Sequence, residues 1–182
     1  MTSEAFRTFM FDRFNWAGSL MASWGYLLHA GRDECGWGDG ADVYPPTGRL
    51  RIRALHALDE DLFADNVYFQ ASEWWRPKSV TGPLHERGFT LVGYSYHCQI
   101  GDGDRDRLRY DYDPLRHPEM PSHIHPLGAP NDDRFFVTPI TLDAVFLSFQ
   151  QVIADKLRDG FQPRLRIADP SSVPVRRHDQ SA

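Results

Sequence analysis

The chain has 182 residues, a length typical of one domain with additions. Hydrophobic residues make up 41% and aromatic residues 13% of the chain, which is enough for a core and excludes disorder throughout. The formal net charge of −5 argues against nucleic-acid binding by bulk positive charge, although a local basic cleft is compatible with it.

The cysteines and the start of the chain indicate a compartment. Cys35 and Cys98 form no CxxC pair, so we expect free thiols, as in a reducing cytoplasm. Residues 1–16 lack the basic start and continuous apolar segment of a signal peptide, and no stretch is long and apolar enough to span a membrane. The sequence therefore predicts a soluble, cytoplasmic protein.

Residues 1–48 are predicted to form an N-terminal helical extension followed by a Gly/Pro-rich loop. Ser3 can cap a helix, and apolar residues then recur at spacings of three and four up to Met21. Apolar residues continue to about residue 30, so one long helix or two helices with a break near Gly18 or Gly25 are both compatible with the pattern. This unit either packs on the rest of the chain or mediates self-association as a homodimer. Residues 31–48 hold five glycines and two prolines, which predicts a loop.

Residues 49–160 are predicted to form an α+β domain. Strand patterns begin at Leu50, Val67, Phe89 and Leu108, and a short one covers residues 134–137. Their short connections predict an antiparallel β-sheet, a meander of four or more strands. A helix beginning after Thr141 and ending before Gly160 is predicted to pack on one face. Residues 161–182 are expected to be a flexible tail.

The segment from Arg109 to Gly128 carries the densest chemistry. Its twenty residues include four prolines, three histidines (His117, His123, His125) and the acidic groups Asp111, Asp113 and Glu119. On an extended segment the rings of His123 and His125 point to the same side. Because imidazole gives and takes protons near neutral pH, the segment predicts proton transfer, anion binding or metal ligation. The alternative is a polar loop with solvated histidines.

Four motifs together resemble the TumE-type toxins of toxin–antitoxin pairs, over roughly residues 68–157. They are EWWRP (73–77), GYSYHCQ (93–99), LRYDYDPLRHPEMPSHIHPLG (108–128) and TLDAVFLSF (141–149). The chain departs from the family pattern at residues 112–114, in having one histidine at 117 instead of a pair, and in its N-terminal extension. The resemblance implies a growth-inhibiting toxin that acts on RNA. It also implies neutralisation by a cognate antitoxin with a helix-turn-helix DNA-binding domain.

Cleavage of RNA without a metal needs a base, an acid and a cation near the phosphate. The predicted catalytic residues are His123, His125, His97, His117 and Arg109, and the predicted substrate-binding residues are Arg116, Tyr96 and Asp111. Strand alternation puts His97 with Ser95 on one face and Tyr96 with Cys98 on the other, so His97 need not point where Tyr96 points.

A metal-dependent route is the alternative chemistry. His117, His123 and His125, with Asp111 or Asp113, are ligand types that suit Zn²⁺, Mn²⁺ or Ni²⁺. We favour the metal-independent route and predict no cofactor.

A second class of function is a non-catalytic protein-binding subunit, of the immunity or accessory type. Its anchors would be aromatic and apolar residues of the N-terminal unit, namely Met10, Phe14, Trp16, Trp24 and Trp37. A small-molecule hydrolase is the weakest reading, because no serine or cysteine nucleophile motif is present.

Overall fold

The computed structural model describes residues 3–28, 34–37, 48–57, 62–77, 84–103, 105–130 and 132–167, and shows an antiparallel sheet with two helices. The predicted α+β class is therefore confirmed. The elements are α1 (Ser3–Ser23), β1 (Tyr26–Leu28), β2 (Glu34–Trp37), β3 (Gly48–Ala57), β4 (Leu62–Pro77), β5 (Leu84–Glu86), β6 (Phe89–Ile100), β7 (Arg107–Tyr112), β8 (Ser122–His125), β9 (Phe135–Phe136), α2 (Leu142–Arg158) and β10 (Leu165–Ile167).

The sheet is a meander over most of its width. Its main path runs β1-β3-β4-β6-β7-β8-β9, while β2 pairs with β3, β5 with β6 and β10 with β4. Every pairing is antiparallel, and β4 and β6, the two longest strands, form its centre. The predicted meander is confirmed, because strands close in sequence pair through short connections.

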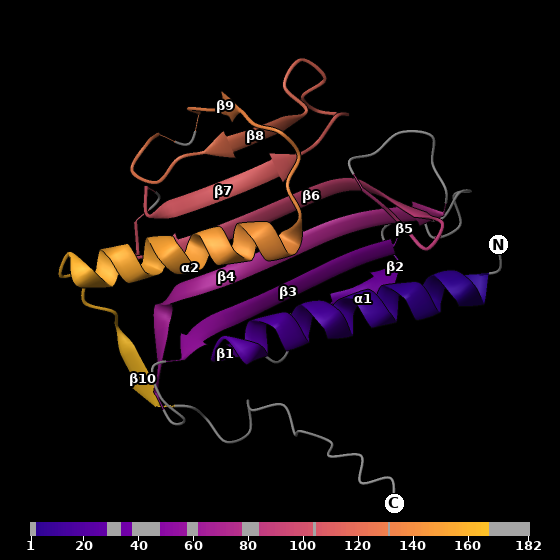
Figure 1. The fold of residues 1–182 in the computed structure, drawn as a ribbon. Helices are drawn as coiled ribbons and strands as arrows, with labels where there is room; N and C mark the ends of the chain where they lie inside the picture. Colours follow the sequence, from indigo (N-terminus) through magenta and orange to yellow (C-terminus); the bar gives the residue numbers. More distant parts are fainter. Residues whose placement is uncertain are drawn as a thin grey trace, which may run out of the picture.

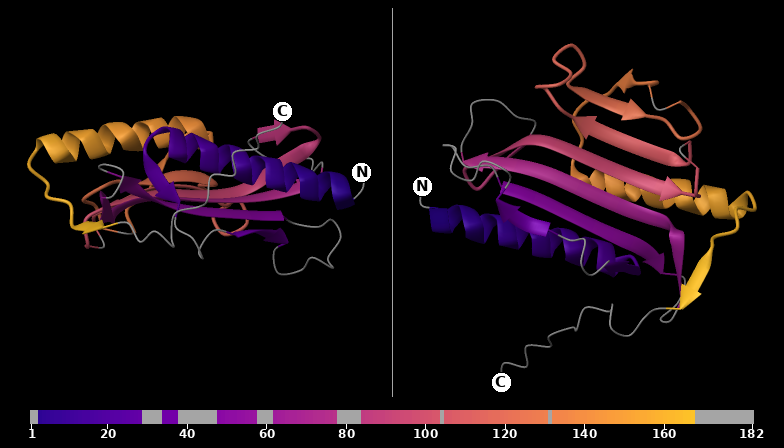
Figure 2. Two further views of the ribbon diagram at one scale, coloured as in Figure 1. Left: turned by 90° about the horizontal axis from the view of Figure 1, so that it is seen from below. Right: turned by 180° about the vertical axis from the view of Figure 1, so that it is seen from behind.

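Both helices lie on the same face of the sheet, as the view from below shows most clearly (Figure 1; Figure 2, left). On α1 the buried apolar side chains follow the predicted spacing of three and four, and they are Phe6, Phe9, Met10, Ala17 and Met21. On α2 they are Leu142, Val145, Phe146, Phe149 and Ile153, also as predicted. The two apolar stripes cover one side of the sheet, which is how an amphipathic helix removes its apolar surface from water.

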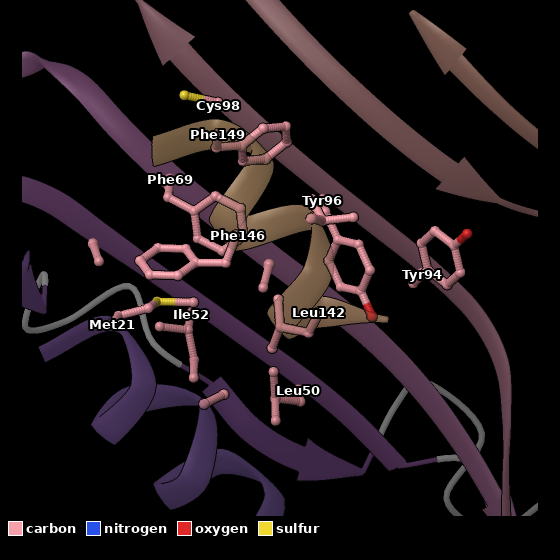
Figure 3. Packing of buried hydrophobic residues seen from close by; sticks show 14 of the residues in the cluster. Met21, Leu50, Ile52, Phe69, Tyr94, Tyr96, Cys98, Leu142, Phe146 and Phe149 are labelled. Carbon is pink, nitrogen blue, oxygen red and sulfur yellow. The ribbon is translucent and has the colours of Figure 1, made fainter. Parts of the chain in front are cut away.

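The core forms between these helices and alternate residues of the central strands. Phe146 and Phe149 of α2 pack against Phe69 of β4, with ring centroids 5.0 and 5.2 Å from it (Figure 3). Tyr96 and Cys98 of β6 belong to the same cluster, so the predicted alternation places them on the helix side. Burial raises the pKa of the Cys98 thiol, which is unpaired. The opposite face of the sheet therefore receives Ser95 and His97.

One ion pair is buried within this core. Arg13 of α1 donates two hydrogen bonds to Glu73 of β4, at 3.0 and 2.9 Å. The Trp75 indole and the Tyr96 hydroxyl donate to the same carboxylate at 2.8 and 2.7 Å. Because Glu73 has no exposed surface, these four donors replace its water shell and fix α1 on the sheet.

Three segments differ from the sequence prediction. The N-terminal helix ends at Ser23, and Gly25, with a φ of 77°, turns the chain into β1. The predicted loop at 31–48 contains β2, and the predicted tail contains β10. Strand β10 is held at its start by Arg164, which pairs with Asp65 and Asp102, partners about 100 and 60 residues earlier in the chain. Residues 168–182 of the predicted tail lie outside the described residues. Among the described helices none has the length and apolarity needed to cross a membrane.

Candidate active site

The register of three neighbouring strands assembles the candidate site on the face without helices. Ser95 of β6 lies opposite Asp111 of β7, which lies opposite His123 of β8. Two residues further along these strands, on the same face, Arg109 lies between His97 on β6 and His125 on β8. Directly opposite residues have Cβ atoms about 4.5–5.5 Å apart, so the pairing alone brings these side chains together.

Asp111 is the centre of this cluster. Its Oδ2 lies 2.7 Å from Arg109 Nε, 3.4 Å from His125 Nε2 and 3.6 Å from His123 Nε2. Burial by itself raises the pKa of Asp111, but contacts with His125 and Ser95 and the charge of Arg109 outweigh it. The net pKa is lower than usual, and the group is a carboxylate at neutral pH.

The ring of His123 has a defined orientation. Nδ1 lies 3.0 Å from the carbonyl oxygen of Met120, which can only accept, so Nδ1 carries a proton. In the neutral ring Nε2 then has a free lone pair, directed towards Asp111. Burial lowers the pKa of His123, so this neutral form predominates at pH 7. His123 is thus a base with a carboxylate beside it that stabilises the protonated ring.

Arg109 bridges Asp111 and His125. Its Nη2 lies 2.7 Å from His125 Nε2, and because a guanidinium can only donate, the imidazole accepts here. The Arg109 side chain keeps 36% of its surface exposed, against 7% for His125. Arg109 is therefore the accessible cation of the cluster, and its hydrogen bond to the buried His125 holds the guanidinium in place.

His117 extends the row of imidazoles from the loop before β8. Its ring centroid is 5.2 Å from that of His123, which in turn is 5.1 Å from that of His125. Arg134 Nη1 lies 3.0 and 3.1 Å from the two ring nitrogens of His117. Since these nitrogens point in different directions, one donor equally close to both lies over the ring instead of in its plane. The loop is closed by a hydrogen bond from Asp113 N to Pro121 O, at 2.8 Å.

A cavity of 540 Å³ opens beside the cluster. Its walls include Arg109, Asp111, His117, His123 and Arg116, so five of the eight predicted site residues line one space. The remaining wall comes from residues of β4, β6, β7 and the β7–β8 loop, namely Trp74, Arg76, Val92, Gly93, Tyr94, Ser95, Tyr112, Asp113 and Leu115.

Three predicted site residues do not line this cavity. His125 is buried and hydrogen-bonded to Arg109, as described above. His97 is half-buried against Tyr68, with ring centroids 6.0 Å apart, and burial together with Arg109 and Arg107 lowers its pKa to about 4. Tyr96 is fully buried on the helix face and donates to Glu73, where burial and that carboxylate raise its pKa. The structure thus gives Tyr96 a contact in the core and separates it from the cavity.

The metal-ligand set also differs from the sequence prediction. Asp111, His123 and His125 each offer one ligand atom, and these atoms lie within 4.8 Å of one another. Of the predicted ligands, Asp111, His123 and His125 belong to this set, whereas His117 and Asp113 do not. Arg109 donates to two of these three groups, Asp111 and His125, and supplies a positive charge beside them.

Sequence reasoning missed several residues that line the cavity or contact its lining. Arg134, expected only as part of a short strand, covers His117, and Trp74 and Arg76 reach the cavity from β4. Strand alternation could have found Trp74, because it lies opposite Gly93 on the face of Ser95.

The predicted protein-binding anchors are divided between core and surface. Met10 is buried and Phe14 half-buried, whereas Trp16 and Trp24 are 41% and 49% exposed. The side chain of Trp37 lies outside the described residues.

The chain was compared with protein-family models, with curated proteins and with solved structures, and none of them matches it.

Proposed function

We propose that this protein is the toxin of a toxin–antitoxin pair and inhibits growth by cleaving RNA. The observation that supports this most is the convergence of Asp111, His123 and Arg109 with His117 and Arg116 on one cavity. These are the group types that phosphodiester cleavage needs, and the sequence resemblance points to the same activity.

Each group has a proposed role in the reaction. His123 Nε2 takes the proton of the 2′-hydroxyl, whose oxygen then attacks phosphorus, and Asp111 stabilises the protonated ring. His117, whose ring centroid lies 5.2 Å from that of His123, protonates the departing 5′-oxygen. Arg109 and Arg116 bind the phosphate and stabilise its developing charge. His125 holds Arg109 in position, and His97 packs behind the same arginine.

Expression in a host tests the biological role. The wild-type chain should arrest growth, and co-expression of a neighbouring gene for a small helix-turn-helix protein should relieve the arrest. His123→Asn should remove toxicity while leaving a folded protein, since asparagine can still donate to the Met120 carbonyl. Full toxicity in the His123→Asn and His117→Asn variants would refute the histidine mechanism.

Cleavage of a labelled RNA by the purified protein tests whether a metal takes part. We expect cleavage to continue after treatment with EDTA, because Arg109 supplies the positive charge. Loss of cleavage with EDTA and recovery with Zn²⁺ or Mn²⁺ would instead assign Asp111, His123 and His125 as metal ligands.

The exposed aromatic residues of α1 and of the turn that follows it favour a second candidate function, protein binding without catalysis. Phe11, Trp16 and Trp24 are 59%, 41% and 49% exposed, and such side chains anchor protein interfaces. A binding subunit would neither arrest growth by itself nor cleave RNA, so the two experiments above separate the candidates.

A further inference from the structure

The view from behind shows the face of the sheet opposite the helices (Figure 2, right). The strand register places a group of arginines on this face. We call this the open face and define it by the side chains of β3, β4, β6 and β7 that point away from α1 and α2. It holds six arginines, namely Arg49, Arg51, Arg53, Arg76, Arg107 and Arg109. Over strand positions 49–53, 68–76, 93–99 and 107–111 the only acidic side chain on this face is Asp111, since Glu73 lies in the core. Over these positions of β3, β4, β6 and β7, six arginines therefore stand against one carboxylate, although the formal net charge of the chain is −5.

Two aromatic rings lie among these arginines. The guanidinium carbon of Arg53 is 3.8 Å from the ring centroid of Tyr68, and that of Arg49 is 5.8 Å from that of Trp74. The residues between the arginines, Leu50 and Ile52, are fully buried, which confirms that the arginines point the other way. Nucleic-acid bases stack on aromatic rings and on guanidinium planes, so rings and arginines side by side on a sheet fit unpaired bases joined by phosphates.

The open face leads into the candidate active site. Trp74, Arg76 and Arg109 belong to both, since all three also line the 540 Å³ cavity. Strands in a sheet are about 4.8 Å apart, so β3 lies roughly 14 Å from β7, three strands away. A four-stranded face of this width takes two or three bases in other sheet-based RNA-binding domains.

We propose that single-stranded RNA binds across the open face and that β3 and β4 guide it into the cavity. Arg51 and Arg53 bind phosphates ahead of the scissile one, and Tyr68 and Trp74, with the guanidinium groups stacked on them, support the bases. A duplex fits less well, because it is recognised across its grooves and leaves no base free to stack. This inference relies on the proposed function for RNA as the substrate.

Binding is measured by fluorescence anisotropy with a labelled single-stranded RNA that is 2′-O-methylated throughout. This RNA has no 2′-hydroxyl to attack, so the wild-type protein binds it without cleaving it. The Arg51→Ala/Arg53→Ala variant should bind about tenfold more weakly, and its slope of log K against log salt should be smaller by about 1.4, or about 0.7 per lost phosphate contact. The matched control is Arg7→Ala/Arg158→Ala, which removes two exposed arginines from the helices and should change affinity less than twofold.

Equal affinity loss in the two double variants, or no loss in either, would overturn the proposal. If the Arg51→Ala/Arg53→Ala variant does not fold, crosslinking of RNA to the wild-type protein tests the proposal instead. A 4-thiouridine RNA should crosslink to residues 68–76, whereas crosslinks only to α1 or α2 would refute RNA binding across the open face. If the wild-type protein binds unmodified RNA but does not cleave it, the proposed function is refuted and RNA binding across the open face still stands. If the Arg51→Ala/Arg53→Ala variant cleaves RNA and binds it as tightly as the wild type does, RNA binding across the open face is refuted and the proposed function still stands.

Discussion

The two faces of the sheet each carry an arginine–carboxylate pair, and the pairs differ in what else the carboxylate contacts. On the helix face, Glu73 has no exposed surface and accepts from Arg13, Trp75 and Tyr96. On the open face, Asp111 lines a cavity, is 14% exposed, pairs with Arg109 and lies 3.6 and 3.4 Å from His123 and His125.

This difference separates a structural ion pair from one that is available for chemistry. All the acceptor sites of Glu73 are used by groups that do not titrate near neutral pH, so the pair can only hold α1 on the sheet. Asp111 lies beside the imidazoles of His123 and His125 and lines the 540 Å³ cavity. The same two functional groups thus serve stability on one face and lie beside imidazoles at a cavity on the other.

The largest expected effect comes from neutralising Asp111. We expect Asp111→Asn to lower the RNA cleavage rate about 10²–10⁴-fold, because the protonated His123 loses its counter-charge and Arg109 loses its partner. The matched variant is Glu73→Gln, which should lower stability and leave the cleavage rate per folded molecule within a few-fold. Steady-state kinetics together with circular dichroism measure both. A Glu73→Gln rate as low as that of Asp111→Asn would remove the distinction between the faces.

The next effect concerns stability. Arg13→Ala leaves the Glu73 carboxylate buried without its cation, which should lower the free energy of unfolding by about 3–5 kcal/mol. Arg87→Ala breaks an ion pair whose members are 64% and 49% exposed, and it should cost less than about 1 kcal/mol. Urea denaturation measures both, and similar costs for the two variants would show that the buried pair does not fix α1.

His97 should make folding sensitive to acid. Its pKa is about 4 in the folded protein and about 6.5 in the unfolded chain, so the unfolded chain binds the proton first as the pH falls. The free energy of unfolding should therefore decrease between pH 6.5 and 4, by about 3 kcal/mol at most. His97→Gln should have a flatter stability profile over this range. An unchanged slope in that variant would assign the acid sensitivity to another group.

The smallest expected effect concerns the acid limb of the pH–rate profile, that is, the pH below which kcat/KM falls. Because burial lowers the pKa of His123, the base stays neutral below pH 6.5, and cleavage should lose activity only below that pH. The dependence of kcat/KM on pH for a short RNA measures this. The limb should stay in place in His97→Gln, since His97 does not line the cavity. A limb above pH 6.5 would contradict His123 as the base.

Local pattern in the sequence was sufficient for the elements and for part of the site. Helix α2 was predictable because its apolar spacing, the polar residue before it and Gly160 after it all agree. The common direction of His123 and His125 was also predictable, because it requires only an extended backbone, which β8 provides. Strands β2 and β10 were not, since short segments without clear alternation become strands only when a distant partner offers its edge.

The sequence by itself determined the α+β class, the meander and the histidine-rich segment, because these depend on side-chain periodicity and turn residues within a few positions. Only the tertiary structure decided that Asp111 lies between two imidazoles, that Arg134 covers His117 and that Tyr96 contacts Glu73 in the core. These contacts depend on strand register and on which face the helices cover. Both are set by the burial of apolar surface between segments far apart in the chain, which no local pattern records.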